Sequence, residues 1–117
     1  MTAFSAPVAD IRFSLETQAG YGDLAALWSE DATDADLVEA MLTEAGRLAD
    51  EVYAPLNHAG DLSGSVLENG VVRLPEGFTE AYRSMADGGW VGLSFQEDLG
   101  GQGLPWSLSL AVSEIFE

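Results

Sequence analysis

The stretch "TDADLVEAMLTEAGRLADEVY", residues 33–53, carries the strongest fold signal in this sequence of 117 residues. Its apolar residues recur every three or four positions, which is the spacing of one helix face. They are Leu37, Val38, Met41, Leu42, Ala45, Leu48, Ala49, Val52 and Tyr53. Thr33 or Asp34 can cap the N-terminus, and Pro55 should allow little continuation because proline lacks an N–H group. We therefore predict a long helix here that buries this stripe.

Two shorter patterns flank this helix. Val8, Ile11 and Leu15 follow Pro7 at helical spacing, and the glycines of "GYG" at residues 20–22 should end that segment. On the other side, "SVLENGVVRL" (residues 65–74) joins two apolar runs through Asn-Gly. This dipeptide accepts the positive φ angles of a type I′ turn, so these ten residues are predicted to form a small β-hairpin.

Two further helices are predicted in the C-terminal half. Pro75 and Gly77 precede an apolar face that should run to the stop signal Gly88-Gly89; its residues are Phe78, Ala81, Tyr82 and Met85. Pro105 suits the first turn of a last helix, with Leu108, Ala111, Val112, Ile115 and Phe116 on its apolar face. The sequence thus predicts a mainly α fold with one small β-hairpin.

The charge balance excludes several kinds of partner. Four Arg, no Lys and 20 Asp plus Glu give a formal net charge of -16, which repels nucleic-acid phosphates and anionic lipids. No apolar run approaches the length of a bilayer span, and "MTAFSAPVADIRF" lacks the features of a signal peptide. With no Cys there is no disulfide framework either. We expect no nucleic-acid or membrane partner and a cytoplasmic location.

The glycine cluster in "EDLGGQGLPW" (residues 97–106) raises the possibility of a phosphate-binding loop. "WVGLSF" could serve as a preceding strand, but counting from Gly101 the third glycine of a dinucleotide fingerprint is replaced by Trp106. A P-loop would need Lys, which the chain lacks. We therefore predict a sharp turn between two packed helices, with Gly100, Gly101 and Gly103 supplying positive φ or close approach.

Other candidate sites also fail on residue type. His58 is the only histidine, and no partner for a catalytic or metal site is evident in the sequence. "DADLVE" opens like a calcium loop at Asp34, but Glu39 stands where the turn glycine is required. Ser94 is followed by Gln96 where a nucleophile elbow needs glycine. The three tryptophans, Trp28, Trp90 and Trp106, are interpreted as core. We predict no catalytic, cofactor-binding or metal-binding residue in this chain.

Whole stretches of the sequence resemble a known family. "EVYAPLNHAGD" (51–61), "GVVRLPEGFTEAYRSMADGGWVGL" (70–93) and "EDLGGQGLPWSLSLAVSEIF" (97–116) are similar to the N-terminal helical domain of FAD-dependent acyl-CoA dehydrogenases. "APVADIRFSLE" and the hairpin with "LENG" resemble the bacterial branch that includes methylmercaptopropionyl-CoA dehydrogenases, which carry an extra N-terminal segment. Gln96 departs from the family, which often has proline there. The resemblance implies an N-terminal extension with a short helix over residues 1–32 and the family's helical domain over 33–117.

This resemblance implies a part in the α,β-dehydrogenation of an acyl-CoA thioester. In the complete enzyme, FAD would take the hydride and an electron-transfer flavoprotein the electrons, and the assembly would be a homo-oligomer. The resemblance assigns the catalytic base to a C-terminal helical domain and most flavin contacts to a flavin-binding β-domain, and these residues include neither domain. The chain would then be a scaffold and part of the acyl-site wall, colourless and inactive by itself.

Two alternatives stay open. The chain could be a short, flavin-free helical interaction module derived from the family, or a subunit that pairs with a separate flavoprotein subunit. The resemblance also predicts that the last helix packs partly against domains outside these residues, through Leu108, Val112, Ile115 and Phe116. The chain alone should then expose this face and self-associate through it, more strongly as salt rises.

Overall fold

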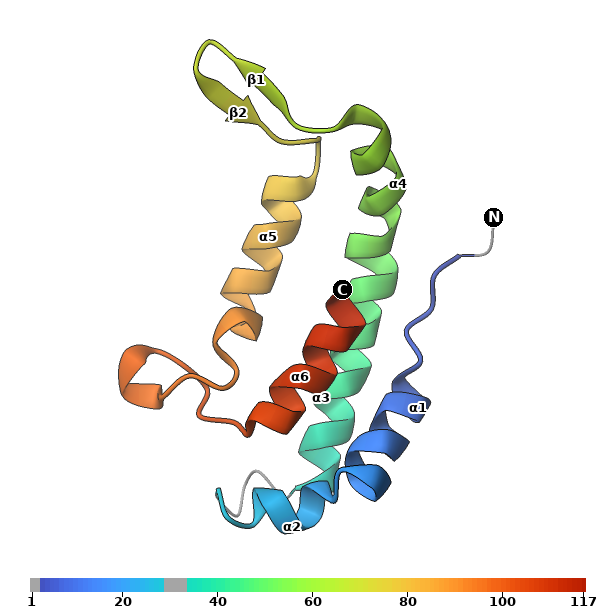
Figure 1. Ribbon diagram of the computed structural model, residues 1–117, viewed down its shortest axis with the longest axis vertical. Helices are drawn as coiled ribbons and strands as arrows, with labels where there is room; N and C mark the ends of the chain where they lie inside the picture. Colours follow the sequence, from blue (N-terminus) through green and yellow to red (C-terminus); the bar gives the residue numbers. More distant parts are fainter. Residues whose placement is uncertain (1–2, 29–33) are drawn as a thin grey trace.

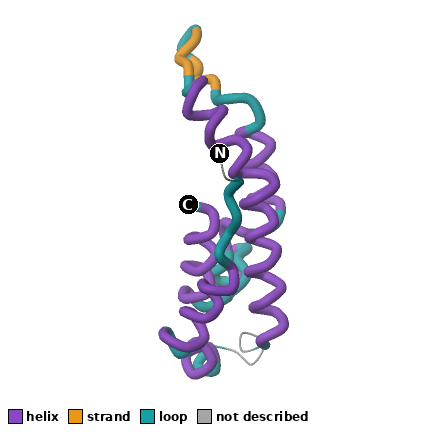
Figure 2. The backbone as a smooth tube through the Cα atoms, turned by 90° about the vertical axis from the view of Figure 1, so that its right-hand side faces the viewer, coloured by secondary structure: helices purple, strands orange, loops and turns teal. Residues whose placement is uncertain are grey.

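A nearly continuous helical rod runs along most of the molecule (Figure 1). The computed structural model describes residues 3–28 and 34–117. The rod consists of α3 (Ala35–Leu48), a π-helical turn (Ala49–Tyr53) and α4 (Ala54–Ser63). All other elements are arranged along this rod, and the whole is flat, with extents of 52 × 39 × 18 Å (Figure 2).

The start of α3 follows the predicted capping chemistry. The Asp34 carboxylate accepts hydrogen bonds from the backbone N–H groups of Asp36, at 2.9 Å, and Leu37, at 3.4 Å. These donors belong to the first turn of the helix, where no backbone carbonyl can reach them. The Asp34 cap is confirmed, whereas Thr33, the other predicted cap, lies outside the described residues.

The prediction that Pro55 would end the long helix is wrong. Pro55 lies in the first turn of α4, directly after the π-helical turn Ala49–Tyr53. In a π turn the hydrogen bonds reach one residue further back than in an α-helix, so the backbone hydrogen-bonding pattern is already interrupted where the proline enters. A proline in a first helical turn also gives up no N–H that a standard helix would use. The rod therefore passes Pro55 and adds the 10 residues of α4.

The predicted stripe of α3 forms the centre of the core. Its buried members are Val38, Leu42, Ala45, Leu48 and, in the following turn, Ala49. Met41, Val52 and Tyr53 are half-buried, and Leu37 is exposed. The orientation of the helix is therefore confirmed, with the stripe narrower at its N-terminal end than predicted.

The N-terminal segment packs against α3 and belongs to the same core. It forms α1 (Val8–Phe13), as predicted, extended by a π-helical turn (Ser14–Gln18). A Cβ at Gly46 of α3 would lie 2.8 Å from a methyl group of Val8, so only glycine permits the two helices to approach this closely. Arg12 also pairs with Glu39 of α3 at 2.7 Å.

Gly20 ends this segment in a left-handed conformation, with φ 64°, as predicted for "GYG". A second short helix, α2 (Tyr21–Ala25), begins immediately after it and was not predicted. Tyr21 and Ala25 are both buried and join Ile11 and Leu15 in the core. The amphipathic pattern of five residues was too short to distinguish from a loop in the sequence.

The last helix, α6 (Trp106–Phe116), buries its apolar face within this chain. Leu108, Ala111, Val112 and Ile115 are all buried, and the helix packs against α3 and the N-terminal segment. The expectation that this face would be exposed is wrong for Leu108, Val112 and Ile115, because α3 and the N-terminal segment cover them, whereas Phe116 is only half-buried. The expected self-association through this face therefore loses its basis.

The hairpin and α5 follow the sequence predictions closely. Strands β1 (Val66–Glu68) and β2 (Val71–Arg73) are antiparallel. Their turn residues have φ angles of 52° and 78°, as a type I′ turn requires. Helix α5 (Phe78–Asp87) then runs to the predicted glycine stop. The hairpin stands at the end of the molecule where α4 stops and α5 starts (Figure 1).

The tryptophans are less buried than predicted. Trp28 is 52% exposed and Trp106 58% exposed, so neither is a core residue. Only Trp90 is half-buried, with its ring edge-on to Phe116 at a centroid distance of 5.6 Å. Residue type alone indicates where tryptophan usually lies, and the covering surface needed to bury two of these rings does not exist among the described residues.

Candidate functional site

The glycine loop cannot hold a phosphate through its backbone, because its N–H groups are already bonded. Gly101 N–H donates to Gln96 O at 3.0 Å, and Gly103 N–H donates to Phe95 O at 2.8 Å. The N–H groups of Gln102 and Leu104 are bonded to backbone carbonyls in the same way. No strand precedes the loop either, since Trp90–Gly92 is a 3-10 turn. These hydrogen bonds are a second argument, from geometry, against a phosphate site in the loop.

The same loop confirms the predicted role of its glycines. Gly100 and Gly103 have positive φ angles of 87° and 65°. A Cβ at Gly101 would lie 2.1 Å from the carbonyl oxygen of Phe95, so this glycine is required for close approach. The three residues together turn the chain from the short helix Glu97–Leu99 into α6.

The other candidates from the sequence are not brought together. His58 is exposed on α4, and Ser94 follows the turn Trp90–Gly92. The Asp34 carboxylate is used as a helix cap. Across residues 3–28 and 34–117 there is no group of three or more His, Asp or Glu side chains that could hold a metal ion.

An open groove of about 1030 Å³ lies between the rod and α5. The π-helical turn and α4 supply one wall, α5 supplies the other, and the C-terminal end of α6 lies between them (Figure 1). Its apolar lining includes Tyr53, Leu56, Phe78, Tyr82, Met85 and Phe116. Sequence reasoning missed this groove, although the apolar stripe of α5 was a signal that the helix faces something.

Aromatic contacts form the inner end of the groove. The Tyr53 and Phe116 rings meet edge to face, with centroids 5.3 Å apart. Tyr53 also donates a long hydrogen bond of 3.5 Å from its hydroxyl to the carbonyl of Ala81 on α5. Burial raises the pKa of the Tyr53 phenol above its ordinary value, so the phenol is neutral at physiological pH. Tyr53 therefore adds no charge to the groove, whose lining here also includes the carboxylates of Asp50 and Glu117.

At the other end, two glycines let the walls meet. The Phe78 ring of α5 lies against Gly60 of α4, where a Cβ would come within 2.4 Å of the ring. The Leu56 side chain lies against Gly77, where a Cβ would come within 2.8 Å of it. These two contacts join α5 to α4 close to the hairpin, and the groove opens from there toward the end of α6.

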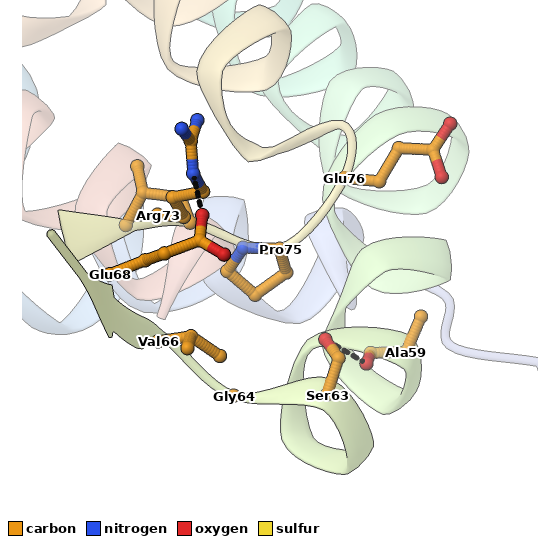
Figure 3. Close-up of a pocket in the computed structure, with 9 residues that line it drawn as sticks. Ala59, Ser63, Gly64, Val66, Glu68, Arg73, Pro75 and Glu76 are labelled. Atoms are coloured by element: carbon orange, nitrogen blue, oxygen red, sulfur yellow. Dashed lines mark hydrogen bonds and ion pairs between the residues drawn. The ribbon is translucent and has the colours of Figure 1, made fainter. Parts of the chain in front are cut away.

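A second, smaller hollow of about 520 Å³ lies between the end of α4 and the hairpin (Figure 3). Arg73 pairs with Glu68 across the two strands, and the Ser63 hydroxyl donates to the carbonyl of Ala59 at 3.0 Å. These polar groups bind one another and are not directed at a common point. The hollow shows no arrangement that could perform acid–base or nucleophilic chemistry.

The chain is 41% identical over 112 residues, 96% of its length, to a 3-methylmercaptopropionyl-CoA dehydrogenase from Ruegeria pomeroyi. The predicted resemblance to acyl-CoA dehydrogenases is confirmed. The match spans only 19% of that relative, so this chain corresponds to about a fifth of a full-length dehydrogenase. No protein-family profile matches the chain.

The described part of the chain contains no helix that is both long and apolar enough to cross a bilayer. Among the described residues, Arg12, Arg47 and Arg73 each form ion pairs with glutamates. Arg47, for example, lies 2.7 Å from Glu44, which lowers the pKa of that carboxyl group through the hydrogen bond. These pairs neutralise most of the few positive charges, and the surface that remains is strongly acidic.

Proposed function

We propose that this chain is the N-terminal scaffold of a flavin-dependent acyl-CoA dehydrogenase. Residues 1–32 would be an N-terminal extension and residues 33–117 the helical domain of that family. The complete enzyme would catalyse α,β-dehydrogenation of an acyl-CoA thioester with FAD and pass electrons to an electron-transfer flavoprotein. It would be a cytoplasmic homo-oligomer, and this chain would contribute part of the wall of its acyl site.

The observation that carries this proposal is the combination of a close match with partial coverage. The chain is 41% identical to the dehydrogenase from Ruegeria pomeroyi over almost its whole length, yet it spans only 19% of that protein. Within the described residues there is no group of three or more His, Asp or Glu side chains that could hold a metal ion, and the backbone N–H groups of the glycine loop are engaged. These residues show no fit to the FAD diphosphate, so we assign them no step of the reaction.

The described residues can hold helices in fixed relative positions. The core formed by α1, α3 and α6 is continuous, with Leu42, Leu108 and Val112 fully buried at its centre. A close-packed core of this kind holds its surface helices in fixed relative positions. The chain could thereby hold one wall of an acyl site in place while the hydride transfer itself depends on other domains.

A chimera tests the proposal. The matching 112 residues of the Ruegeria pomeroyi dehydrogenase are replaced by this chain, and FAD content and turnover of 3-methylmercaptopropionyl-CoA are measured with an artificial electron acceptor. We expect stoichiometric FAD and turnover within about tenfold of the parent, a barrier change of about 1.4 kcal/mol. A scaffold that keeps the same core should support the other domains even with different surface residues.

The control is the same dehydrogenase without the matching segment, which should lose FAD and activity. A chimera that lacks FAD and activity to the same extent as this control would argue against the scaffold role and favour the helical interaction module. The remaining alternative is a subunit that pairs with a separate flavoprotein subunit. It is tested by adding this chain, as a separate polypeptide, to the dehydrogenase that lacks the matching segment. Recovery of activity in trans would indicate that the chain can act as a separate subunit.

The isolated chain is expected to be colourless after purification. Its residues offer no flavin cradle, so absorbance near 450 nm, where flavins absorb, should be absent, and acyl-CoA should not be oxidised with any artificial acceptor. The measurement is a visible spectrum of the chain purified with and without added FAD. A stoichiometric yellow chromophore would contradict the assignment of this chain as scaffold only.

A further inference from the structure

The tip of the hairpin, between β1 and β2, consists of Asn69 and Gly70, and both residues are exposed. Asn69 has a φ angle of 52° and is the only described residue other than glycine with a positive φ. Among the described residues, no hydrogen bond uses its side-chain amide or the backbone N–H of Gly70. A Cβ built on Gly70 would meet no atom within 4 Å. The amide carbon of Asn69 and the nitrogen that follows it are therefore uncrowded and open to water.

An asparagine followed by glycine is chemically labile, because glycine has no Cβ to hinder attack by its own nitrogen. The Gly70 nitrogen loses its proton and attacks the side-chain Cγ of Asn69. A bond forms from Cγ to this nitrogen, the bond from Cγ to the amide nitrogen breaks, and the amide leaves as ammonia with one added proton. The product is a succinimide ring. Water then opens the ring at one of its two carbonyl carbons and gives aspartate or isoaspartate.

The closed turn restrains this reaction, so its rate depends on how often the hairpin opens. The positive φ angles of a type I′ turn and the pairing of Glu68 with Val71 hold the two reacting atoms in place, whereas ring closure needs them within bonding distance. The strands have three residues each and are exposed throughout. A two-stranded hairpin of this kind is marginally stable, and the exposed ion pair between Arg73 and Glu68 adds little. Local opening therefore costs little free energy and leaves the core closed.

We propose that Asn69 is a site of spontaneous deamidation through a succinimide that forms when the hairpin opens, with water as the co-reactant. Either product adds a negative charge beside Glu68. In isoaspartate the backbone also runs through the side-chain carbon atoms, so a two-residue turn no longer matches the pairing of Glu68 with Val71. The modification therefore loosens the hairpin. It depends on the chain's own turn and on water, and not on the flavin chemistry or the proposed scaffold role.

Asn57 provides an internal control, because it is the only other asparagine of the chain and lies within α4. Both asparagines lie in one tryptic peptide, residues 48–73. The purified chain is incubated in mildly alkaline buffer, and tandem mass spectrometry follows deamidation at each position. The backbone at Asn57 is committed to helix hydrogen bonds, so Asn69 should react at least about tenfold faster, a barrier difference of about 1.4 kcal/mol. Equal rates, or no reaction at Asn69, would overturn the proposal.

The isoaspartate product distinguishes the succinimide route from direct hydrolysis of the amide. A protein-isoaspartate methyltransferase adds a labelled methyl group to isoaspartate and leaves ordinary aspartate unlabelled. We expect label in the peptide 48–73 of the incubated chain, and none above background in the same peptide of Asn69→Gln. Deamidation of Asn69 without label would mean that water attacks the amide directly, which is incompatible with the succinimide.

Two matched variants test the opening step. Glu68→Gln removes the ion pair with Arg73 across the strands, and Glu51→Gln removes one acidic charge and one exposed ion pair on the rod. If the reaction proceeds from the open hairpin, Glu68→Gln accelerates deamidation of Asn69 by about two- to fivefold, whereas Glu51→Gln leaves the rate nearly unchanged. The same rate in both variants would show that opening of the hairpin does not limit the reaction and would contradict the proposed route.

Discussion

Replacing Leu108 by alanine is expected to lower the free energy of unfolding by about 3 to 5 kcal/mol, the upper part of the range for buried leucines. Leu108 has no exposed surface and is one of the largest fully buried side chains, on the face of α6 that packs on α3. Removal of its isobutyl group leaves a cavity that the surrounding side chains can fill only in part. Urea denaturation followed by circular dichroism measures the change.

Leu110 provides a matched control in the same helix. The same substitution there removes a side chain that is 64% exposed, so the free energy of unfolding should change by less than about 0.5 kcal/mol. Similar losses at Leu108 and Leu110 would mean that α6 does not present the face described here. A large loss at Leu110 alone would mean that the helix is rotated by half a turn.

The contrast between these two leucines also shows what an amphipathic pattern can predict. The spacing of the apolar residues in α6 identified the correct face, since Leu108, Val112 and Ile115 are all buried. It could not identify the surface that covers this face. The cover comes partly from residues 3–28, far earlier in the chain, and no local pattern records such a pairing.

Pro55 shows a second limit of local reasoning. Proline in the interior of a standard helix costs about 3 kcal/mol or more, so a helix end was the correct expectation from sequence alone. The rod avoids this cost with a π-helical turn, Ala49–Tyr53, directly before the proline. The same turn places Ala49 in the core and Tyr53 against Phe116. The backbone conformation at this turn therefore goes with packing contacts that the sequence pattern does not show.

The groove could not be predicted for a related reason. Its aromatic residues Tyr53, Phe78 and Phe116 lie on three elements that are distant in sequence. The negative predictions, in contrast, depended on residue identity, and for the glycine loop the bonded N–H groups add a geometric argument to them. Short motifs can be rejected from sequence when a required residue type is missing, whereas a surface built from separate helices needs their arrangement.

The second large effect is expected at Gly101, in the loop that turns into α6. An added methyl group would lie 2.1 Å from the carbonyl oxygen of Phe95 and 2.4 Å from its carbon. Both atoms are backbone, so no side-chain rotation can relieve the clash. The loop must instead move and weaken two hydrogen bonds, Gly101 N–H to Gln96 O and Gly103 N–H to Phe95 O. We expect Gly101→Ala to cost about 3 kcal/mol of unfolding free energy.

Gly22→Ala is the matched control, because it adds the same methyl group where no atom lies within 4 Å. Gly22 lies within α2 and its φ angle is not positive, so alanine should be neutral or stabilise by up to about 1 kcal/mol. Thermal and urea unfolding of the two variants distinguish steric conflict from a general effect of replacing glycine. If Gly101→Ala unfolds at the same urea concentration as Gly22→Ala, the loop is not closed against Phe95, and its N–H groups would be free for the anion site that the closed loop excludes.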